Sequence, residues 1–269
     1  MHKADSNTGR KSQKTNLEIH FCGVGEAFDE NLPNTSILLR MFNKDESRYI
    51  LLDCGFTAAP AFWKISPAPL DLSGVWISHL HGDHFMGLPQ LLIRFSEHGR
   101  DKKLHIFGGQ GLSETVATAM ELAYPGKMSS LPFDIAFHET VPGIPFEIAG
   151  ISALAVDVEH SVPCLGIRLD FKGKSVFYSG DGKVPDKARD ALEDTDMGIF
   201  ETFTLETETS GHSSVAQAAT FARSAGIKYV AAVHMNRAQR ILNRHLVLDK
   251  LAEYQVRGFM PEPGDMAAL

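Results

Sequence analysis

Short apolar runs alternate with segments of glycine, proline and polar residues along the chain from Leu17 onward. Runs that are rich in branched residues and end at turn-forming residues are typical of strands. We expect strands at 17–25, 34–42, 48–55, 74–80, 104–108, 133–139, 146–158, 164–171, 175–179, 197–203 and 228–233.

Apolar residues three and four positions apart predict helices among these strands. The expected helices cover 61–65, 89–99, 113–123, 214–226 and 237–254. We expect Ser113 to cap the start of its helix and Gly226 to end another. Strands and helices follow the same order in both halves, which favours an α/β fold with two packed sheets and helices outside.

The composition, with 43% hydrophobic and 22% charged residues, excludes collagen-like, low-complexity and wholly disordered proteins. We expect residues 17–269 to form one domain and the polar residues 1–16 to form a mobile tail, or alternatively a basic arm that contacts a partner. The tail lacks the apolar core of a secretory signal, and no segment approaches the roughly 20 apolar residues of a membrane span. The expected location is therefore the cytoplasm, without membrane association.

The net charge and the cysteine content indicate which partners and which redox compartment to expect. The net charge of −7 gives no general attraction to nucleic acid or anionic lipid. Three cysteines form an odd, widely spaced set, so we expect no disulfide framework and a reducing compartment. Several residues that could carry chemistry are expected to be structural, namely Cys164, His20, His105 and His138.

The segment from Ser78 to His84 carries the densest chemistry in the sequence. In extended chain, residues two apart point to the same side, so His79 and His81 share a face. Asp83 and His84 follow in the next turn. Imidazole and carboxylate ligands without a thiolate suit zinc, manganese or iron(II). The alternative, a solvated histidine-rich loop, does not explain why the cluster directly follows an apolar strand.

Three more candidate ligands end other predicted strands: His160, Asp181 and His234. Site residues commonly occupy such positions, where a loop leaves a rigid scaffold. A single histidine of this kind would usually be structural. Three strand-end residues beside a four-residue cluster instead favour one shared metal site.

The pattern H-x-H-x-D-H, followed by a later His, a Gly-Asp and a final His, resembles the metallo-β-lactamase superfamily. Within it, the pattern is most similar to ribonuclease Z, the tRNA 3′-processing endonuclease, and to related phosphodiesterases. The segments that carry the resemblance are 77–92, 158–169, 177–182, 200–203, 211–218 and 233–237. The resemblance implies a four-layer αββα sandwich with a dinuclear metal site at one edge.

The resemblance also implies a division of the ligands between two divalent ions, with zinc expected first and manganese or iron as alternatives. The first ion would take His79, His81 and His160, the second would take Asp83, His84 and His234, and Asp181 would bridge them. Two adjacent cations lower the pKa of a water between them, and the resulting hydroxide attacks the phosphodiester. Asp83 could orient this water or accept its proton.

Four further residues are assigned roles near the substrate. The resemblance pairs His212 with Glu201, and such a pair could protonate the leaving alkoxide. The alternatives are that His212 caps the following helix and that Glu201 orients a metal-bound imidazole. Ser213, at the start of a helix with a Ser214–Gln217 capping box, is expected to meet a phosphate oxygen. Arg237 could bind a substrate phosphate or cap a turn.

The ligand set favours a ribonuclease Z-like phosphodiesterase. Ribonuclease Z holds tRNA with a long arm, which the short bacterial enzymes insert between the positions that match His160 and Asp181. Here only two predicted strands and a turn separate these residues, so a smaller or less structured substrate is expected. The alternatives are tRNA 3′-processing without that arm, a lactone or ester hydrolase, and a non-hydrolytic metal-binding effector. A homodimer is one expected assembly.

Overall fold

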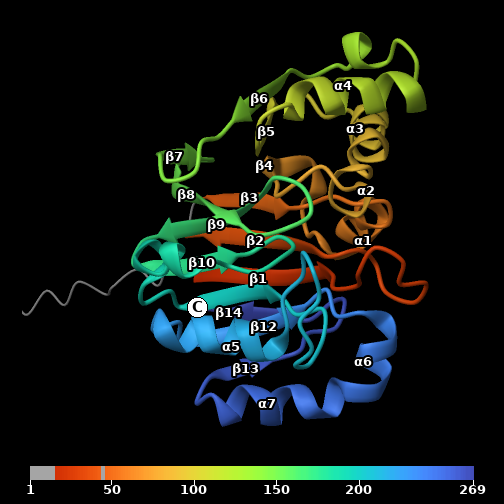
Figure 1. The fold of residues 1–269 in the computed structure, drawn as a ribbon. Coiled ribbons are helices and arrows are strands. Elements are labelled where there is room, and N and C mark those ends of the chain that lie inside the picture. The colour runs from red at the N-terminus through yellow and green to blue at the C-terminus, as the bar shows by residue number, and fades with distance from the viewer. Residues whose placement is uncertain (1–15, 44–45) are drawn as a thin grey trace, which may run out of the picture.

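A computed structural model describes residues 16–43 and 46–269, in which two seven-stranded sheets pack face to face (Figure 1). The first sheet has the order β14 (Met266–Ala268), β1 (Asn16–Gly23), β2 (Ser36–Phe42), β3 (Ser47–Leu52), β4 (Leu72–Ile77), β5 (Leu104–Gly108) and β6 (Ile135–Glu139). The second has the order β13 (Arg257–Phe259), β12 (Tyr229–Val233), β11 (Met197–Glu201), β10 (Lys174–Tyr178), β9 (Cys164–Phe171), β8 (Ile151–Val158) and β7 (Pro145–Ile148).

Helices cover the outer face of each sheet and complete the predicted four layers (Figure 1). The first sheet carries α1 (Ala58–Ile65), α2 (Gly82–Phe85), α3 (Leu88–Glu97) and α4 (Leu112–Ala123). The second carries α5 (Val215–Ser224), α6 (Arg237–Asn243) and α7 (Val247–Glu253). None of the helices within the described ranges has the length and apolar content needed to cross a bilayer.

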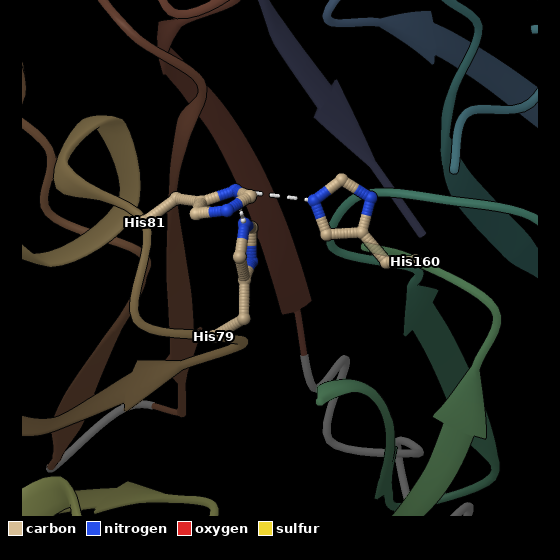
Figure 2. A group of neighbouring side chains, drawn as sticks. All are labelled: His79, His81 and His160. Atoms are coloured by element: carbon tan, nitrogen blue, oxygen red, sulfur yellow. Dashed lines mark hydrogen bonds between the residues drawn. The ribbon is translucent and has the colours of Figure 1, made fainter. Parts of the chain in front are cut away.

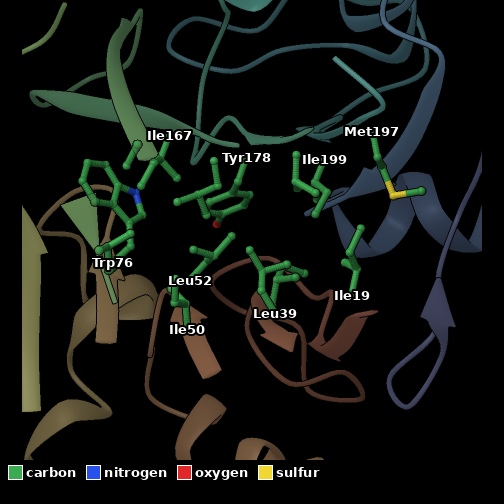
Figure 3. Packing of buried hydrophobic residues seen from close by; sticks show 14 of the residues in the cluster. Ile19, Leu39, Ile50, Leu52, Trp76, Ile167, Tyr178, Met197 and Ile199 are labelled. Carbon is green, nitrogen blue, oxygen red and sulfur yellow. The ribbon is translucent and has the colours of Figure 1, made fainter. Parts of the chain in front are cut away.

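The inner faces of the two sheets share one hydrophobic core (Figure 3). Ile19, Leu39 and Trp76 of the first sheet and Ile167 and Ile199 of the second are almost completely buried in it. Separate apolar clusters pack the helices onto each outer face. Both sheets are therefore buried on two sides, which explains why their strands appear in the sequence as continuous apolar runs.

Several predicted elements differ in detail from the structure. The expected strand at 146–158 is two strands, because Ala149 and Gly150 form a turn with φ values of 52° and 71°. A 3-10 turn at 244–246 splits the expected helix at 237–254. Ser113 does not cap α4, which starts one residue earlier after Gly111. The edge strands β13 and β14 were not predicted.

Other local predictions are confirmed. Ser214 and Gln217 form the capping box of α5, and Gly226 follows that helix with a φ of 67°.

The predicted tail extends to residue 16, but β1 already begins at Asn16, and residues 1–15 lie outside the described part of the chain.

Parallel strands bring the candidate residues to one edge of the sandwich. Strands β3 and β4 run parallel in the first sheet, as do β10, β11 and β12 in the second. The carboxyl ends of neighbouring parallel strands lie at the same edge of a sheet. His79 follows the end of β4, Asp181 follows β10, and His234 directly follows β12.

Candidate metal centre

The first ligand group joins three imidazoles from two loops (Figure 2). Nδ1 of His81 lies 3.1 Å from Nε2 of His79 and 3.1 Å from Nε2 of His160. Two nitrogens bound tetrahedrally to one zinc ion, each at about 2.0–2.1 Å, would lie about 3.3 Å apart. The three predicted residues thus converge with a spacing that suits one ion.

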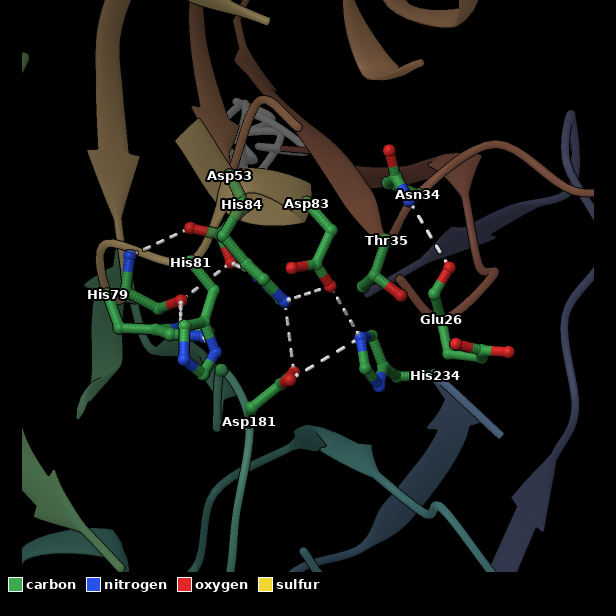
Figure 4. A network of polar contacts seen from close by, with 12 residues as sticks. Glu26, Asn34, Thr35, Asp53, His79, His81, Asp83, His84, Asp181 and His234 are labelled. Atoms are coloured by element: carbon green, nitrogen blue, oxygen red, sulfur yellow. Dashed lines mark hydrogen bonds and ion pairs between the residues drawn. The ribbon is translucent and has the colours of Figure 1, made fainter. Parts of the chain in front are cut away.

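The second ligand group combines two carboxylates and two imidazoles, all buried (Figure 4). Nε2 of His84 lies 3.1 Å from Asp83 Oδ2 and 3.2 Å from Asp181 Oδ1. Nε2 of His234 lies 3.3 Å from Asp83 Oδ2 and 3.4 Å from Asp181 Oδ2. Four residues that are up to 151 positions apart in the chain therefore direct their ligand atoms toward one point.

The two groups are adjacent, and their polar atoms fit a pair of metal ions. The ring centroids of His79 and His84, one from each group, lie 4.2 Å apart. Nε2 of His84 and Oδ1 of Asp181 are buried and have no hydrogen-bond partner among the described residues. A buried polar atom without a partner is costly. A cation between these atoms would satisfy both.

The charges of the second group also favour a cation. Burial would raise the pKa of Asp181, but His234 and His84 hold it well below its usual range. Burial likewise opposes the charge on His234, yet Asp181 and Asp83 raise the pKa of this histidine to about 9. The carboxylates therefore stabilise positive charge at the imidazoles. A divalent ion would supply that charge and leave the imidazoles neutral.

The first group is already suited to donate lone pairs. Burial and the neighbouring His84 lower the pKa of His79 to about 2. Burial also lowers the pKa of His160. Both imidazoles are therefore neutral near pH 7, which is the form that binds metal.

Asp53, which the sequence reasoning missed, orients the second group from behind (Figure 4). Its Oδ2 accepts hydrogen bonds from His84 Nδ1 at 2.7 Å, Ser78 Oγ at 2.7 Å and Tyr178 Oη at 2.6 Å. Its Oδ1 accepts from the Ser78 backbone N–H at 2.7 Å. Because Nδ1 of His84 donates, its Nε2 is free to bind a metal. Asp53 directly follows β3, but the strand predicted at 48–55 contains it, so it was not recognised as a strand-end residue.

His160 is oriented in the same way by a backbone group. Its Nδ1–H donates to the carbonyl oxygen of Gly211, which leaves Nε2 directed at His81. The loop that contains Gly211 also carries His212. One loop, which contains Gly211 and His212, therefore orients His160 of the first group and carries the predicted proton donor.

The predicted pair His212 and Glu201 is in contact in the structure. Nδ1–H of His212 donates to Oε1 of the buried Glu201, while Oε2 accepts from the backbone N–H groups of Gly182 and Ser213. Burial opposes the charge on His212, but Glu201 raises its pKa. Oε1 of Glu201 also lies 3.7 Å from Nδ1 of His234. That separation exceeds hydrogen-bond distance, so Glu201 orients the predicted proton donor but does not hydrogen-bond His234.

Phe203 fixes the plane of the His212 ring. The two rings stack with centroids 4.3 Å apart and an angle of 18° between their planes. The Phe203 backbone N–H donates to the Ser213 carbonyl at 2.8 Å, which ties together the two segments that carry these rings. The sequence reasoning did not single out Phe203.

A cavity of about 440 Å³ opens onto both ligand groups and His212. Arg237 lies at its wall, and its Nη1 donates to Glu26 Oε1 at 2.6 Å. Ser213 is buried, and its Oγ lies 3.4 Å from the Ser214 carbonyl oxygen. The substrate contacts assigned to Ser213 and Arg237 stay predictions.

The remaining candidates make local contacts. Cys164 is buried with its Sγ 3.7 Å from Nδ1 of His79, on the side of the ring that faces away from His81. His105 and His138 are hydrogen-bonded to each other at 2.9 Å, and His20 contacts Glu18 at 3.1 Å.

A match to a known protein family shows which family the chain belongs to. The family described as "Beta-lactamase superfamily domain" matches residues 48–235, well over half of the chain. The chain belongs to the metallo-β-lactamase superfamily. The matched range holds all seven predicted metal ligands.

Curated relatives within the superfamily include several ribonuclease Z proteins. The chain is 35% identical to ribonuclease Z of Listeria welshimeri over 159 residues, which cover 59% of this chain and 50% of that protein. The chain thus spans about half the length of this and the other first-ranked Listeria relatives. It is 26% identical to ribonuclease Z of Bacillus subtilis, with 82% of this chain and 88% of that protein covered.

Solved structures show the same fold. The metallo-β-lactamase fold protein YhfI of Bacillus subtilis matches with a TM-score of 0.77 and 19% identity, covering 95% of this chain and 100% of that one. The short form of human tRNase Z matches with a TM-score of 0.74 and 24% identity. The match covers 93% of this chain and 98% of that one. The protein therefore has the metallo-β-lactamase fold, as the sequence predicts.

Proposed function

We propose that the protein is a metal-dependent phosphodiesterase with a dinuclear site. One observation carries the proposal: seven candidate ligands converge into two adjacent groups, and His212, paired with the buried Glu201, lies at the same cavity. A phosphodiester needs its negative charge neutralised, a water activated and a leaving alkoxide protonated. The relationship to ribonuclease Z supports this reaction class.

The two groups of neighbouring side chains support the division of ligands that the resemblance implies. His79, His81 and His160 would hold one ion, Asp83, His84 and His234 the other, and Asp181 both. When bound, two divalent ions neutralise the phosphoryl oxygens and acidify a water. Zinc suits this mixture of imidazole and carboxylate, and manganese or iron(II) are the alternatives.

The residues of the chain supply the remaining steps. Asp83 would orient the attacking water or accept its proton, since its carboxylate lies among the imidazoles of the second group. His212, whose pKa Glu201 raises, would donate a proton to the leaving alkoxide. Arg237 would bind a phosphate oxygen, and Ser213, just before the N-terminus of α5, would approach another.

The substrate we propose is smaller or less structured than a whole tRNA. Strands β9 and β10, joined by a turn at Lys172 and Gly173, occupy the chain between His160 and Asp181. The main alternative is tRNA 3′-end processing, which the names of the relatives favour. Lactone or ester hydrolysis and a non-hydrolytic metal-binding role are less well supported, because neither explains the His212–Glu201 pair. A homodimer in the cytoplasm stays our expectation.

The test is hydrolysis of bis(p-nitrophenyl) phosphate by the full chain loaded with zinc, manganese or iron(II). We expect turnover that a chelator abolishes and metal restores. No turnover with any of the three metals, at two ions per chain, would favour the non-hydrolytic role. A 3′-extended tRNA precursor separates the enzyme hypotheses, because a single cut beside the discriminator base would identify tRNA processing.

A further inference from the structure

Two phenylalanines line the cavity at the metal centre with their side chains in solvent. Phe28 is 77% exposed and Phe56 is 53% exposed, although large apolar side chains are usually buried. They come from different loops, one after β1 and one after β3. The same cavity contains ligands of both groups, and its volume of about 440 Å³ lies within the range of about 300–1,000 Å³ that small-molecule sites have.

The Phe56 ring packs against the backbone of Gly82, in the loop that carries the candidate ligands His81 and Asp83. A Cβ atom added at Gly82 would lie only 2.2 Å from Cζ of Phe56, so the ring occupies the space beside this glycine. Gly82 lies between the ligands His81 and Asp83. The ring is therefore held close to the metal centre while about half of its surface remains free for another group.

A buried carboxylate holds Phe28 and Arg237 at the same wall. Glu26 is 2% exposed, and its Oε2 accepts a hydrogen bond from the Phe28 backbone N–H at 2.8 Å while its Oε1 accepts from Arg237 at 2.6 Å. The Glu26 carbonyl accepts in turn from Asn34 Nδ2 at 3.2 Å (Figure 4). One buried side chain thus holds the Phe28 backbone and the Arg237 guanidinium at the same cavity.

We propose that this wall binds a nucleobase of the substrate, which stacks on Phe28 and Phe56 while Arg237 contacts the phosphate of the same nucleotide. The inference rests on the proposed phosphodiesterase function and names its substrate class. Aromatic rings bind every nucleobase through its flat face, whereas a saturated group gains no such stacking. Nη1 of Arg237 is bonded to Glu26 and Nε lies 3.8 Å from Glu30 Oε2, which leaves the N–H donors of Nη2 for a phosphate oxygen.

Binding tests the inference without turnover. Titration calorimetry of the zinc-loaded full chain would compare thymidine 5′-monophosphate with deoxyribose 5-phosphate that carries hydrogen in place of the base. We expect the nucleotide to bind about tenfold more tightly. Phe28→Ala and Phe56→Ala should each reduce this ratio toward one. Phe28→Tyr and Phe56→Tyr should retain it, as should Leu122→Ala, which removes an apolar side chain that is 80% exposed on α4.

Cleavage gives a second readout. The wild-type protein should cleave thymidylyl-thymidine with a kcat/KM about tenfold above that of the dinucleotide without bases, and the two alanine variants should lose this preference at unchanged metal content. Equal binding of the two monophosphates, or a ratio that neither alanine variant changes, would overturn the inference. Equally tight binding of a deoxyribose phosphate that carries cyclohexyl would also overturn it. Cleavage of neither dinucleotide, with the tenfold binding preference intact, would overturn the proposed function and leave the nucleobase site standing.

Discussion

His84 and Asp53 are joined by a hydrogen bond of 2.7 Å between Nδ1 of the imidazole and Oδ2 of the carboxylate, and both side chains are completely buried. The same carboxylate accepts from Ser78 and Tyr178. It therefore fixes both a candidate ligand and the start of the ligand loop.

Asp53→Asn should weaken metal binding about 10–100-fold. The amide places N–H groups where the native carboxylate accepts several hydrogen bonds, so His84 loses its fixed tautomer. Metal affinity would be measured by competition with a chromogenic chelator. Tyr178→Phe is the matched control, because it removes one donor to the same carboxylate. The control should cost about 1.5–3 kcal/mol of unfolding free energy and change metal affinity little. Equal affinity losses in both variants would contradict the orienting role of Asp53.

His84→Ala should lower the metal content from two ions per chain toward one and remove most activity, while the fold persists. Its Nε2 faces Asp83 and Asp181, so its loss affects the second group directly. Metal content would be measured by mass spectrometry and the fold by circular dichroism. His138→Ala, at a histidine paired with His105, should keep two ions. Loss of the folded structure together with activity would show that His84 is structural instead.

His212→Ala should lower kcat about 10²–10⁴-fold at nearly constant metal content, which is the usual effect of removing a general acid. The side chain lies with Glu201 and Asp181 in a third group of possible ligands, but it belongs to neither of the two groups assigned to the ions. The measurement is steady-state kinetics on a phosphodiester with an alkyl leaving group. A p-nitrophenolate leaving group needs less protonation, so it should reduce the defect. A defect of equal size with both leaving groups would argue against proton donation.

Gly55→Ala should destabilise the protein by about 3 kcal/mol and lower its metal affinity. A Cβ atom at Gly55 would lie 1.7 Å from the carbonyl oxygen of Asp83, so the ligand loop would have to move. Gly109→Ala is the matched control, because the nearest atom to its added Cβ is Cδ1 of Leu165 at 3.6 Å. Chemical unfolding of the two variants would test this difference, and similar free energies of unfolding would contradict it.

Asp196 should contribute stability that depends on pH. Burial opposes its charge, but the hydrogen bond from Lys228 at 2.7 Å and the one from the Ser175 N–H lower its pKa below 3.8. A carboxylate with a lowered folded pKa stabilises the protein above its unfolded pKa, and this contribution is lost as the pH falls through the folded pKa.

Asp196→Asn should therefore cost about 1 kcal/mol at pH 7, because the Lys228 partner is half exposed. The difference from the wild type should shrink as the pH falls from about 5 toward 2. Urea unfolding at several pH values measures it. Asp190→Asn, at an exposed carboxylate, is the control and should show little difference throughout. A difference between Asp196→Asn and the wild type that does not change with pH would refute the assignment to charge.

The sequence by itself determined most of the strand pattern and the two-sheet fold, and it singled out the candidate ligands. These features depend on local signals: apolar runs define the strands, and the spacing of His79, His81, Asp83 and His84 places four ligands in one turn. The capping box at Ser214 is equally local. Residues that act within a few positions of one another leave a pattern that can be recognised without a structure.

The tertiary structure decided which distant residues support the site. Asp53 meets His84 across 31 positions, and Glu26 meets Arg237 across 211. A strand-end aspartate that orients a ligand has the same local sequence signal as one that only ends a strand. The exposed rings of Phe28 and Phe56 likewise look like core residues until the loops are placed in space. Hydrogen bonds and cavity walls form between segments whose separation along the chain carries no pattern, so only the packing of the two sheets determines them.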